Sequence, residues 1–318
     1  MRDRFFLRLL LWMGLCFAFQ TQAVCAQEIL LPATEVARPE TRSGNGAQRE
    51  TDWGDLEAIF QSKIMAFKGD VGVVVKDMQT GRVLAYQADR LFPAASVIKV
   101  GIMAACLQAV QDGRLQLEDR LQMQGSDRVG GSGVLWLKPL GESYSLIELM
   151  DLMITRSDNT AANMLVNALG MDYCNQYFQN IGLQHTRLER KMMDFSARRR
   201  GIENFVSASD MALIFEKLYR YELLAPEMTQ LCLDILRQQR IRDRIPAKLP
   251  QVTDVAHKTG LENSICHDVG IVYTPKGDYL ICVLVQTRTS FRRAKNLIAD
   301  LALEVYKYMQ QQHWSDSA

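Results

Sequence analysis

Residues 96–110 read SVIKVGIMAACLQAV, a run in which Lys99 is the only charged residue. Pro93, Ala94 and Ala95 lead into this run. A helix that is apolar around its whole circumference is normally buried. The run therefore predicts a central helix that begins near Ser96.

Ser96 and Lys99 are three residues apart, so a helix would place their side chains next to each other. A charged lysine inside an apolar helix is costly unless it has a role or a partner. Burial favours the neutral amine, which can accept the proton of a serine hydroxyl. The pair is a candidate nucleophile and base for acyl transfer, and a snorkelling structural lysine is the alternative.

Two further motifs offer the other groups that acyl transfer requires. Ser157-Asp158-Asn159 brings a second hydroxyl and a carboxamide. Lys258-Thr259-Gly260 brings a cation, a hydroxyl and a flexible glycine on an expected edge strand. An acyl-transfer site needs an activated hydroxyl, a proton path and two donors at the developing oxyanion. The three motifs together therefore predict an acyl-enzyme site.

The composition is that of an ordinary globular protein. The chain has 318 residues and a formal net charge of +1, which suits one large domain or two small ones. No charge excess points to nucleic acid or to a membrane surface. The four histidines do not cluster, and no cysteine–histidine group has zinc-site spacing, so we expect no metal and no cofactor.

Residues 1–26 have the pattern of an export signal peptide. A charged start precedes a run at 5–19 that is apolar apart from Arg8, and Val24-Cys25-Ala26 offers a cleavage site before Gln27. A bilayer span needs about 20 apolar residues. We therefore expect cleavage, no stable membrane insertion of the mature chain, and a periplasmic or secreted location. A retained anchor and lipid attachment at Cys25 are the alternatives.

Export implies an oxidising compartment, in which disulfides can form. An odd number of cysteines follows the signal, so they cannot all pair. Their scatter and apolar neighbours predict mostly buried thiols, with one disulfide as the alternative. These residues are Cys106, Cys174, Cys232, Cys266 and Cys282.

Apolar periodicity predicts strands at both ends of the chain with helices between them. Strand patterns cover residues 71–75, 83–86, 252–258, 269–273 and 279–285. Helical patterns cover residues 55–67, 146–155, 160–169, 210–221, 225–239 and 291–311. The expected fold class is α/β of the α+β type: an antiparallel sheet built from both chain ends, flanked by helices, with an inserted all-helical lobe.

The domain organisation expected is one catalytic domain behind a short N-terminal extension. Residues 27–51 have loop composition and are expected to form a flexible leader. The catalytic domain would cover 52–318, with its helical lobe at about 95–236. The site would lie in the cleft between the sheet and the lobe, a usual place for ligands.

The three motifs resemble those of class A β-lactamases and penicillin-binding proteins. The similarity covers roughly residues 52–310 and includes SDNTAAN at 157–163, HKTG at 257–260 and DVGIV at 268–272. The resemblance implies the β-lactamase and DD-peptidase-like fold. It also implies that Ser96 is the nucleophile, Lys99 its base or part of the proton relay, and Ser157 the group that passes a proton to the leaving nitrogen.

The resemblance assigns the binding groups as well. The backbone N–H groups of Ser96 and Leu261 would form the oxyanion hole. Asn159 would hold the amide side chain of the substrate. The groups implied for the substrate carboxylate are Lys258, Thr259 and Gly260 of the third motif, with Arg244 as a second cation.

One part of the family pattern is missing. The deacylating glutamate of the family lies on the ω loop, two residues after an arginine. Here Arg190 is followed by Met192 at that spacing, and Asn204 stands in place of the closing aspartate of the loop. A methionine cannot activate water. The candidate substitute carboxylates are Asp194, Glu203 and Glu189.

The resulting interpretation is a monomeric serine hydrolase that forms an acyl-enzyme on Ser96 and opens the ring of penicillin-type β-lactams. A D-alanyl-D-alanine peptidase, cell-wall amidase or esterase is the first alternative, and the missing glutamate favours it. A penicillin-binding sensor without turnover is the second. A triad of Ser96, His257 and Asp268 is disfavoured, because Lys99 supplies a base and no Gly-x-Ser-x-Gly elbow surrounds Ser96.

Overall fold

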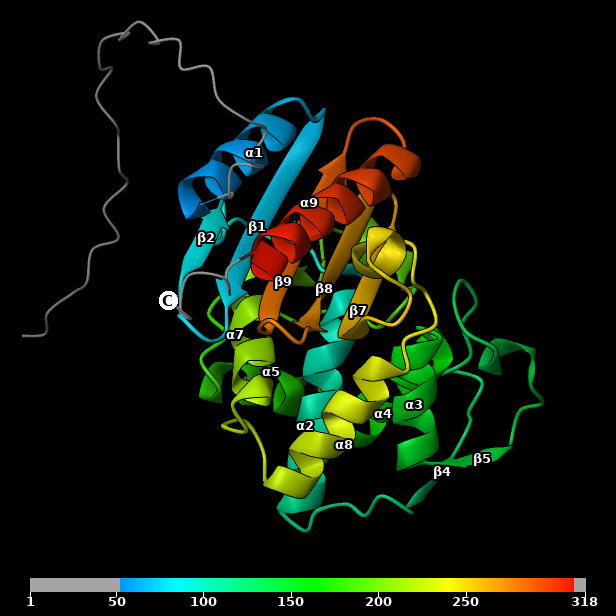
Figure 1. The fold of residues 1–318 in the computed structure, drawn as a ribbon. Helices are drawn as coiled ribbons and strands as arrows, with labels where there is room; N and C mark the ends of the chain where they lie inside the picture. Colours follow the sequence, from blue (N-terminus) through cyan, green and yellow to red (C-terminus); the bar gives the residue numbers. More distant parts are fainter. Residues whose placement is uncertain (1–51, 312–318) are drawn as a thin grey trace, which may run out of the picture. The chain divides into compact units, whose positions relative to one another are not determined.

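The computed structural model describes residues 52–311, so the predicted signal peptide, its cleavage site and the leader lie outside the described residues. A five-stranded antiparallel sheet combines two strands from near the start of the described chain with three from near its end, in the order β2-β1-β9-β8-β7 (Figure 1). Its strands are β1 (Gly69–Asp77), β2 (Val83–Tyr86), β7 (Asp254–Glu262), β8 (Ile265–Tyr273) and β9 (Tyr279–Thr287). The predicted fold class is confirmed.

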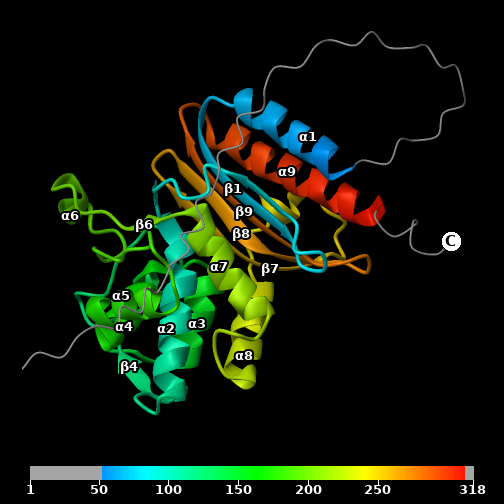
Figure 2. The same cartoon turned by 90° about the vertical axis from the view of Figure 1, so that its left-hand side faces the viewer.

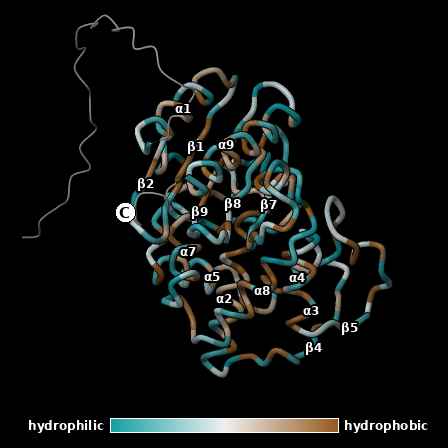
Figure 3. The backbone as a smooth tube through the Cα atoms, viewed as in Figure 1, coloured by the Kyte–Doolittle hydropathy of each residue, from teal (hydrophilic) through white to brown (hydrophobic). Residues whose placement is uncertain are grey.

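Strands β1 and β9 join the two parts of the chain, because they pair along their whole length from Gly69 opposite Thr287 to Asp77 opposite Tyr279. Both faces of this central pair are buried. Val73 and Val283 point into one apolar cluster, and their neighbours Val74 and Leu284 point into another. Side chains alternate between the faces of a strand, so apolar residues run continuously along the buried strands (Figure 3).

Two helices cover one face of the sheet: α1 (Trp53–Met65) and α9 (Phe291–Gln311). Figures 1 and 2 show both helices lying along the strands on that face. On α9, Leu301 and Val305 are fully buried among the residues of this cluster. This layer contains none of the predicted site residues.

The helical region between β2 and β7 covers the other face (Figure 2). Its central member, α2, is the predicted buried helix. It follows directly on the 3-10 turn η1 (Ala95–Ile98), and Lys99, Val100 and Ile102 near its start are fully buried. The larger helices are α2 (Lys99–Gln111), α3 (Leu146–Thr155), α4 (Asn159–Leu169), α5 (Met171–Asn180), α7 (Ala208–Tyr219) and α8 (Pro226–Arg237).

The sequence patterns missed some short elements. Helix α5 reads MDYCNQYFQN and buries only Cys174, Tyr177 and Phe178, so its apolar stripe is narrow. The remaining elements are too short to show a period. They are α6 (Phe195–Arg199), β3 (Phe92–Pro93) paired with β6 (Phe205–Val206), β4 (Arg120–Gln122) paired with β5 (Ser143–Ser145), η2 (Leu135–Leu137) and η3 (Ile245–Lys248).

All five cysteines of the described part of the chain are free and buried, so the prediction of buried thiols is confirmed. Burial raises the pKa of the Cys106 thiol to about 12, which makes it unreactive near neutral pH. None of the helices between residues 52 and 311 is both long enough and apolar enough to cross a membrane.

Candidate active site

Ser96 lies in η1, the turn that leads into α2. Its side chain is half-buried, whereas Val97 and Ile98 beside it are fully buried. The chain before it is held from two sides. His267 Nε2 donates to the carbonyl of Pro93 at 3.0 Å, and Ala94 N donates to the carbonyl of Asn204 at 2.7 Å. The serine is therefore the accessible residue of a fixed turn.

Lys99 lies one turn further on and is completely buried. Its Nζ donates to the carbonyl of Ser157 and to Oδ1 of Asn159, both at 2.8 Å. Burial lowers the pKa of Lys99 to about 7, because the amine loses its hydration, although the negative charges of Asp158 and Glu262 partly oppose this shift. A large fraction of the amine is therefore neutral near pH 7 and able to accept a proton.

The hydroxyl of Ser157 lies between two lysines. It receives a hydrogen bond from Lys258 Nζ at 3.0 Å and a longer one from Lys99 Nζ at 3.4 Å. Burial, the neighbouring Lys99 and then Arg244 lower the pKa of Lys258 well below its usual value. The structure thus brings one residue of each motif together around a single hydroxyl.

Asp158 is a positioning residue that the motif analysis did not single out. Its carboxylate is fully buried and caps α4 by accepting from Ala161 N at 3.0 Å. It also accepts from the backbone N–H groups of Val134 and Leu135 at 2.6 and 2.9 Å. These bonds fix the loop that lies across from Ser96. An aspartate directly before a helical pattern is an N-cap signal that could have predicted this role.

The third motif lies on β7, which is the edge strand that the sequence predicts. At Gly260 a Cβ atom would lie 3.2 Å from the side chain of Val97 and 3.3 Å from that of Ala95. Strand β7 therefore passes close against η1. The next residue, Leu261, is 45% exposed and shares the cleft with Ser96, so both predicted oxyanion-hole residues lie at the same site.

A cleft of about 270 Å³ opens at Ser96. Of the predicted site residues, Ser96, Asn159 and Leu261 line it, whereas Lys99, Ser157, Lys258, Thr259 and Gly260 are buried and do not belong to its lining. The other lining residues come from η1, the loop between β4 and η2, the segment 188–204, and the end of β7 with the residue after it: Ala95, Gly131, Ser132, Arg190, Met192, Met193, Phe195, Asn204, Glu262 and Asn263.

Arg244 does not reach the lining of this cleft. Its guanidinium is buried and bonds to Cys266 Sγ at 3.3 Å and to Asp243 Oδ1 at 2.9 Å. Its positive charge acts on Lys258 by lowering the pKa of that amine. Direct binding of a substrate carboxylate by Arg244 stays a prediction.

The family model described as "Beta-lactamase enzyme family" matches residues 55–309. The chain belongs to the beta-lactamase enzyme family. It is 26% identical over 291 residues to a β-lactamase of Streptomyces albus G (88% of this chain, 91% of the relative). It is 30% identical over 270 residues to that of Streptomyces fradiae (81% of this chain, 85% of the relative).

Solved structures agree with this assignment. PBP-A superimposes with a TM-score of 0.77 at 30% identity, covering 82% of this chain and 98% of PBP-A. A β-lactamase from Sphaerobacter thermophilus superimposes with a TM-score of 0.75 at 28% identity, covering 81% and 98%. The predicted resemblance to class A β-lactamases is therefore confirmed, and the chain is a class A β-lactamase-like serine hydrolase.

In this family member, three asparagine side chains hold the loop that carries Met192. Each amide bonds to both the N–H and the carbonyl of one loop residue. Asn175 pairs with Leu188 at 2.8 and 2.9 Å. Asn204 pairs with Arg190 at 2.9 and 3.0 Å, and Asn163 pairs with Met192 at 2.9 and 3.3 Å. Every second residue is thus fixed as in a strand, which keeps Met192 in the cleft wall.

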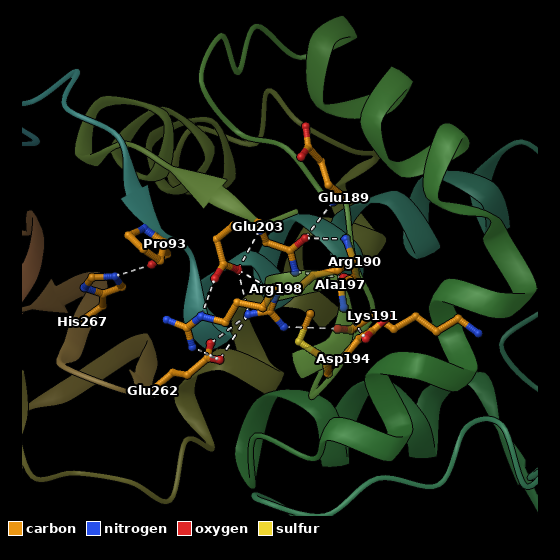
Figure 4. A network of polar contacts seen from close by, with 12 residues as sticks. Pro93, Glu189, Arg190, Lys191, Asp194, Ala197, Arg198, Glu203, Glu262 and His267 are labelled. Carbon is orange, nitrogen blue, oxygen red and sulfur yellow. Dashed lines mark hydrogen bonds and ion pairs between the residues drawn. The ribbon is translucent and has the colours of Figure 1, made fainter. Parts of the chain in front are cut away.

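None of the three substitute carboxylates that we considered lines the cleft. Asp194 caps α6 by accepting from Ala197 N at 2.9 Å. Glu203 is buried and binds Arg190 and Arg198. Glu189 is exposed. The one carboxylate among the described lining residues belongs to Glu262, which also binds these two arginines (Figure 4).

His257 and Asp268 form a buried pair, with His257 Nδ1 2.9 Å from Asp268 Oδ1. Asp268 also accepts from Ile245 N at 3.0 Å, so the pair ties β7 and β8 to η3. Neither residue lines the cleft with Ser96.

Within residues 52–311, no group of three or more histidine, cysteine, aspartate or glutamate side chains is arranged to hold a metal ion.

Proposed function

We propose that this family member reacts with β-lactams by forming an acyl-enzyme on Ser96, that this opens the lactam ring, and that hydrolysis of the acyl-enzyme is the slow step. The observation that carries the proposal is the meeting of Lys99, Ser157 and Lys258 around one buried hydroxyl, with Lys99 one helical turn along the chain from the accessible Ser96. An activated nucleophile next to a proton path is what acyl transfer requires.

In the proposed acylation, the neutral amine of Lys99 accepts the proton of Ser96, and Ser96 Oγ forms a bond to the lactam carbonyl carbon. The oxygen of the tetrahedral intermediate carries the negative charge, which the backbone N–H groups of Ser96 and Leu261 stabilise. The C–N bond then breaks, and the Ser157 hydroxyl donates a proton to the leaving nitrogen. Lys258 and Lys99 both donate to that hydroxyl, so its proton can be replaced.

Three relatives support a β-lactam as the substrate class. The curated relatives from Streptomyces are β-lactamases. A leucine-to-glutamate mutant of PBP-A was solved as an acyl-enzyme complex with penicillin G, and it superimposes with a TM-score of 0.76 at 30% identity. These likenesses support penicillin-type compounds as the first candidates for the acyl donor.

Met192 supports slow hydrolysis. The backbone of this residue is fixed in the cleft wall by Asn163, and a thioether cannot remove a proton from water. The same observation favours a second candidate function, in which the acyl donor is a D-alanyl-D-alanine peptide or the protein is a penicillin sensor. For both functions we also propose export, with cleavage before Gln27.

Mass spectrometry of the intact protein during exposure to benzylpenicillin tests the proposal. We expect an adduct with the full mass of the penicillin to form on the wild type and to persist for much longer than it takes to form. Ser96→Ala should give no adduct while keeping its circular dichroism spectrum. An adduct on Ser96→Ala, or no adduct on the wild type, would contradict the proposal.

A further inference from the structure

Glu262 places a negative charge in the cleft where no motif predicts one. It follows Leu261 at the end of β7 and lines the cleft together with Ser96 and Asn159. Its side chain is 18% exposed, so its carboxylate is accessible from the cleft. A carboxylate at this place can act on a substrate in two ways, as a base or as a binding group.

The contacts of Glu262 fix its side chain, which suits it to act as a binding group. Its Oε1 accepts from Arg198 Nη1 at 2.8 Å and from Arg190 Nη2 at 3.2 Å (Figure 4). These bonds fix the direction in which the carboxylate points.

Arg190 and Arg198 each contact two carboxylates, those of Glu203 and Glu262, so their positive charge is divided between the two. Arg190 lies closer to Glu203, at 2.7 Å, than to Glu262, and Arg198 also contacts Glu203 at 3.1 Å. Among the described residues, Oε2 of Glu262 accepts a single hydrogen bond, which is 3.3 Å long, from Arg190 Nη2. A carboxylate oxygen can accept two hydrogen bonds. Oε2 therefore keeps room for a donor that enters the cleft.

Glu262 lies next to the residues that are predicted to bind the acyl part of a substrate. Leu261, the predicted oxyanion-hole residue, directly precedes it, and Asn159, the predicted holder of the amide side chain, lines the same cleft. Met192, Met193 and Glu262 line this cleft too and are therefore the candidates to contact a group attached beyond that amide.

On the basis of the proposed function, we propose that Glu262 selects substrates that carry a protonated amino group on the acyl side chain. An ammonium next to the amide would donate to Oε2 of Glu262 while both arginines stay in place. The class of substrate is thus an amino-acylated β-lactam, or a peptide with a free amine before the D-alanine that is attacked. Charge-assisted bonds of this kind are stronger than neutral ones.

Two penicillins test this inference, because ampicillin differs from benzylpenicillin only by an α-amino group. The quantity to measure is the ratio of their second-order acylation rate constants, from the rate of adduct formation. We expect Glu262→Gln to lower the ratio of ampicillin to benzylpenicillin by about fivefold or more, from the loss of one charge-assisted bond at a partly exposed site. The charge of Glu262 also acts on the pKa of Lys99, but this effect is common to both penicillins and cancels in the ratio.

Glu203→Gln is the matched control. It alters the same two arginines but leaves the cleft carboxylate in place. We expect both penicillins to respond alike, so that the ratio is unchanged. An equal fall in the ratio for both variants would mean that the arginine network, and not recognition by Glu262, sets it, and would overturn the inference.

The wild type gives an independent test that needs no variant. An α-amino group has a pKa of about 7.7–8.0, so the ratio should be high at pH 6.5 and should fall toward the Glu262→Gln value by pH 9. Titration of Lys99 affects both penicillins equally and cancels in the ratio. A pH-independent ratio would overturn the inference alone, whereas failure of both penicillins to label Ser96 would overturn it together with the proposed function.

Discussion

Of the six non-glycine residues with a positive φ in the described part of the chain, three lie at or beside the reaction site. Ala95, directly before the nucleophile, has a φ of +42°, Ser157 has a φ of +55°, and Met193 in the cleft wall has a φ of +64°. A residue with a side chain is uncommon in this left-handed region, and such conformations persist only where the surroundings impose them. Motif analysis identified Ser157 by its residue type, but a residue type does not show that the backbone at Ala95, Ser157 or Met193 is left-handed.

Lys99 is expected to be required for chemistry and dispensable for folding. Lys99→Met removes a buried amine and keeps an unbranched side chain of similar length, so the free energy of unfolding should stay the same or rise. Acylation by benzylpenicillin should slow by at least ~100-fold, the lower range for losing a general base. Thermal unfolding and adduct formation measure the two effects. A destabilised variant with normal acylation would make Lys99 a structural residue.

The pKa of about 7 for Lys99 predicts how acylation depends on pH. The rate should rise about tenfold per pH unit below pH 7, where the amine is mostly protonated, and level off above that point. Rates of adduct formation with benzylpenicillin between pH 5 and 9 measure the profile. The residual activity of Lys99→Met should lack this dependence.

The same pKa couples Lys99 to stability. In the unfolded chain the amine titrates near 10.5, whereas in the folded chain it titrates near 7. Between these values the unfolded chain binds more protons, so this residue makes folding more favourable as the pH rises. The stability advantage of Lys99→Met over the wild type should therefore be largest at pH 7 and below, and should shrink toward pH 10.

Met192→Glu is expected to convert slow turnover into faster turnover. Asn163 holds only the backbone of residue 192, so a glutamate there would keep the same place in the cleft wall. A carboxylate near the acyl ester can activate water, an effect of about 100-fold or more on hydrolysis. The lifetime of the benzylpenicillin adduct is the measurement. Met192→Gln introduces a side chain with the shape of glutamate but without its basic carboxylate, so the adduct should stay as long-lived as in the wild type.

At the scale of elements, side-chain hydrogen bonds replace regular secondary structure around the cleft. Residues 188–192 belong to none of the helices or strands, yet the amides of Asn163, Asn175 and Asn204 fix every second residue of this segment. A side chain also fixes the loop before η2, because the carboxylate of Asp158 accepts from the backbone N–H groups of Val134 and Leu135. These loops form the walls that determine which substrates enter.

The loop that Asp158 holds gives a testable prediction about stability. Gly133 has a φ of +97°, and a Cβ there would lie 2.2 Å from the carboxylate of Asp158. Gly201 has a similar φ of +83°, but a Cβ there would meet nothing within 4 Å. Gly201→Ala should therefore cost about 1–2 kcal/mol of stability from strain alone.

Gly133→Ala should cost clearly more, because it must also displace a buried carboxylate that holds three backbone N–H groups. Its acylation rate should fall as well, since Gly131 and Ser132 of the same loop line the cleft. Chemical denaturation and adduct formation measure the two variants side by side. Equal losses in both variants would show that the Asp158 anchor is unimportant.

The sequence predicted the elements that buried apolar side chains stabilise, and it missed those that polar contacts hold. Strands β1, β8 and β9 and helix α2 are mostly buried, so their apolar residues leave a clear pattern, and the three motifs lie on or beside these elements. Helix α5 and the loop 188–204 are held by few apolar side chains and by single amides such as Asn175. Glu262 was missed because its position depends on Arg190 and Arg198, which are distant in sequence.

At the scale of the whole domain, the sheet is shared by two apolar cores. Alternate residues of β1 and β9 belong to the core under α1 and α9 and to the core under the helical region. Neither core can lose its packing without exposing one face of the same strands. We therefore expect residues 52–311 to unfold in one cooperative transition, although the reaction site involves only one of the two cores.

Two buried leucines test this cooperativity. Leu301 on α9 and Leu149 on α3 are both completely buried, one in each core. Leu301→Ala and Leu149→Ala should each lower the free energy of unfolding by about 2–5 kcal/mol. In both variants the loss of circular dichroism and the loss of penicillin labelling should occur at the same temperature. If Leu301→Ala separated the two losses, the sheet would not couple the cores, and the reaction site would belong to an independently stable helical unit.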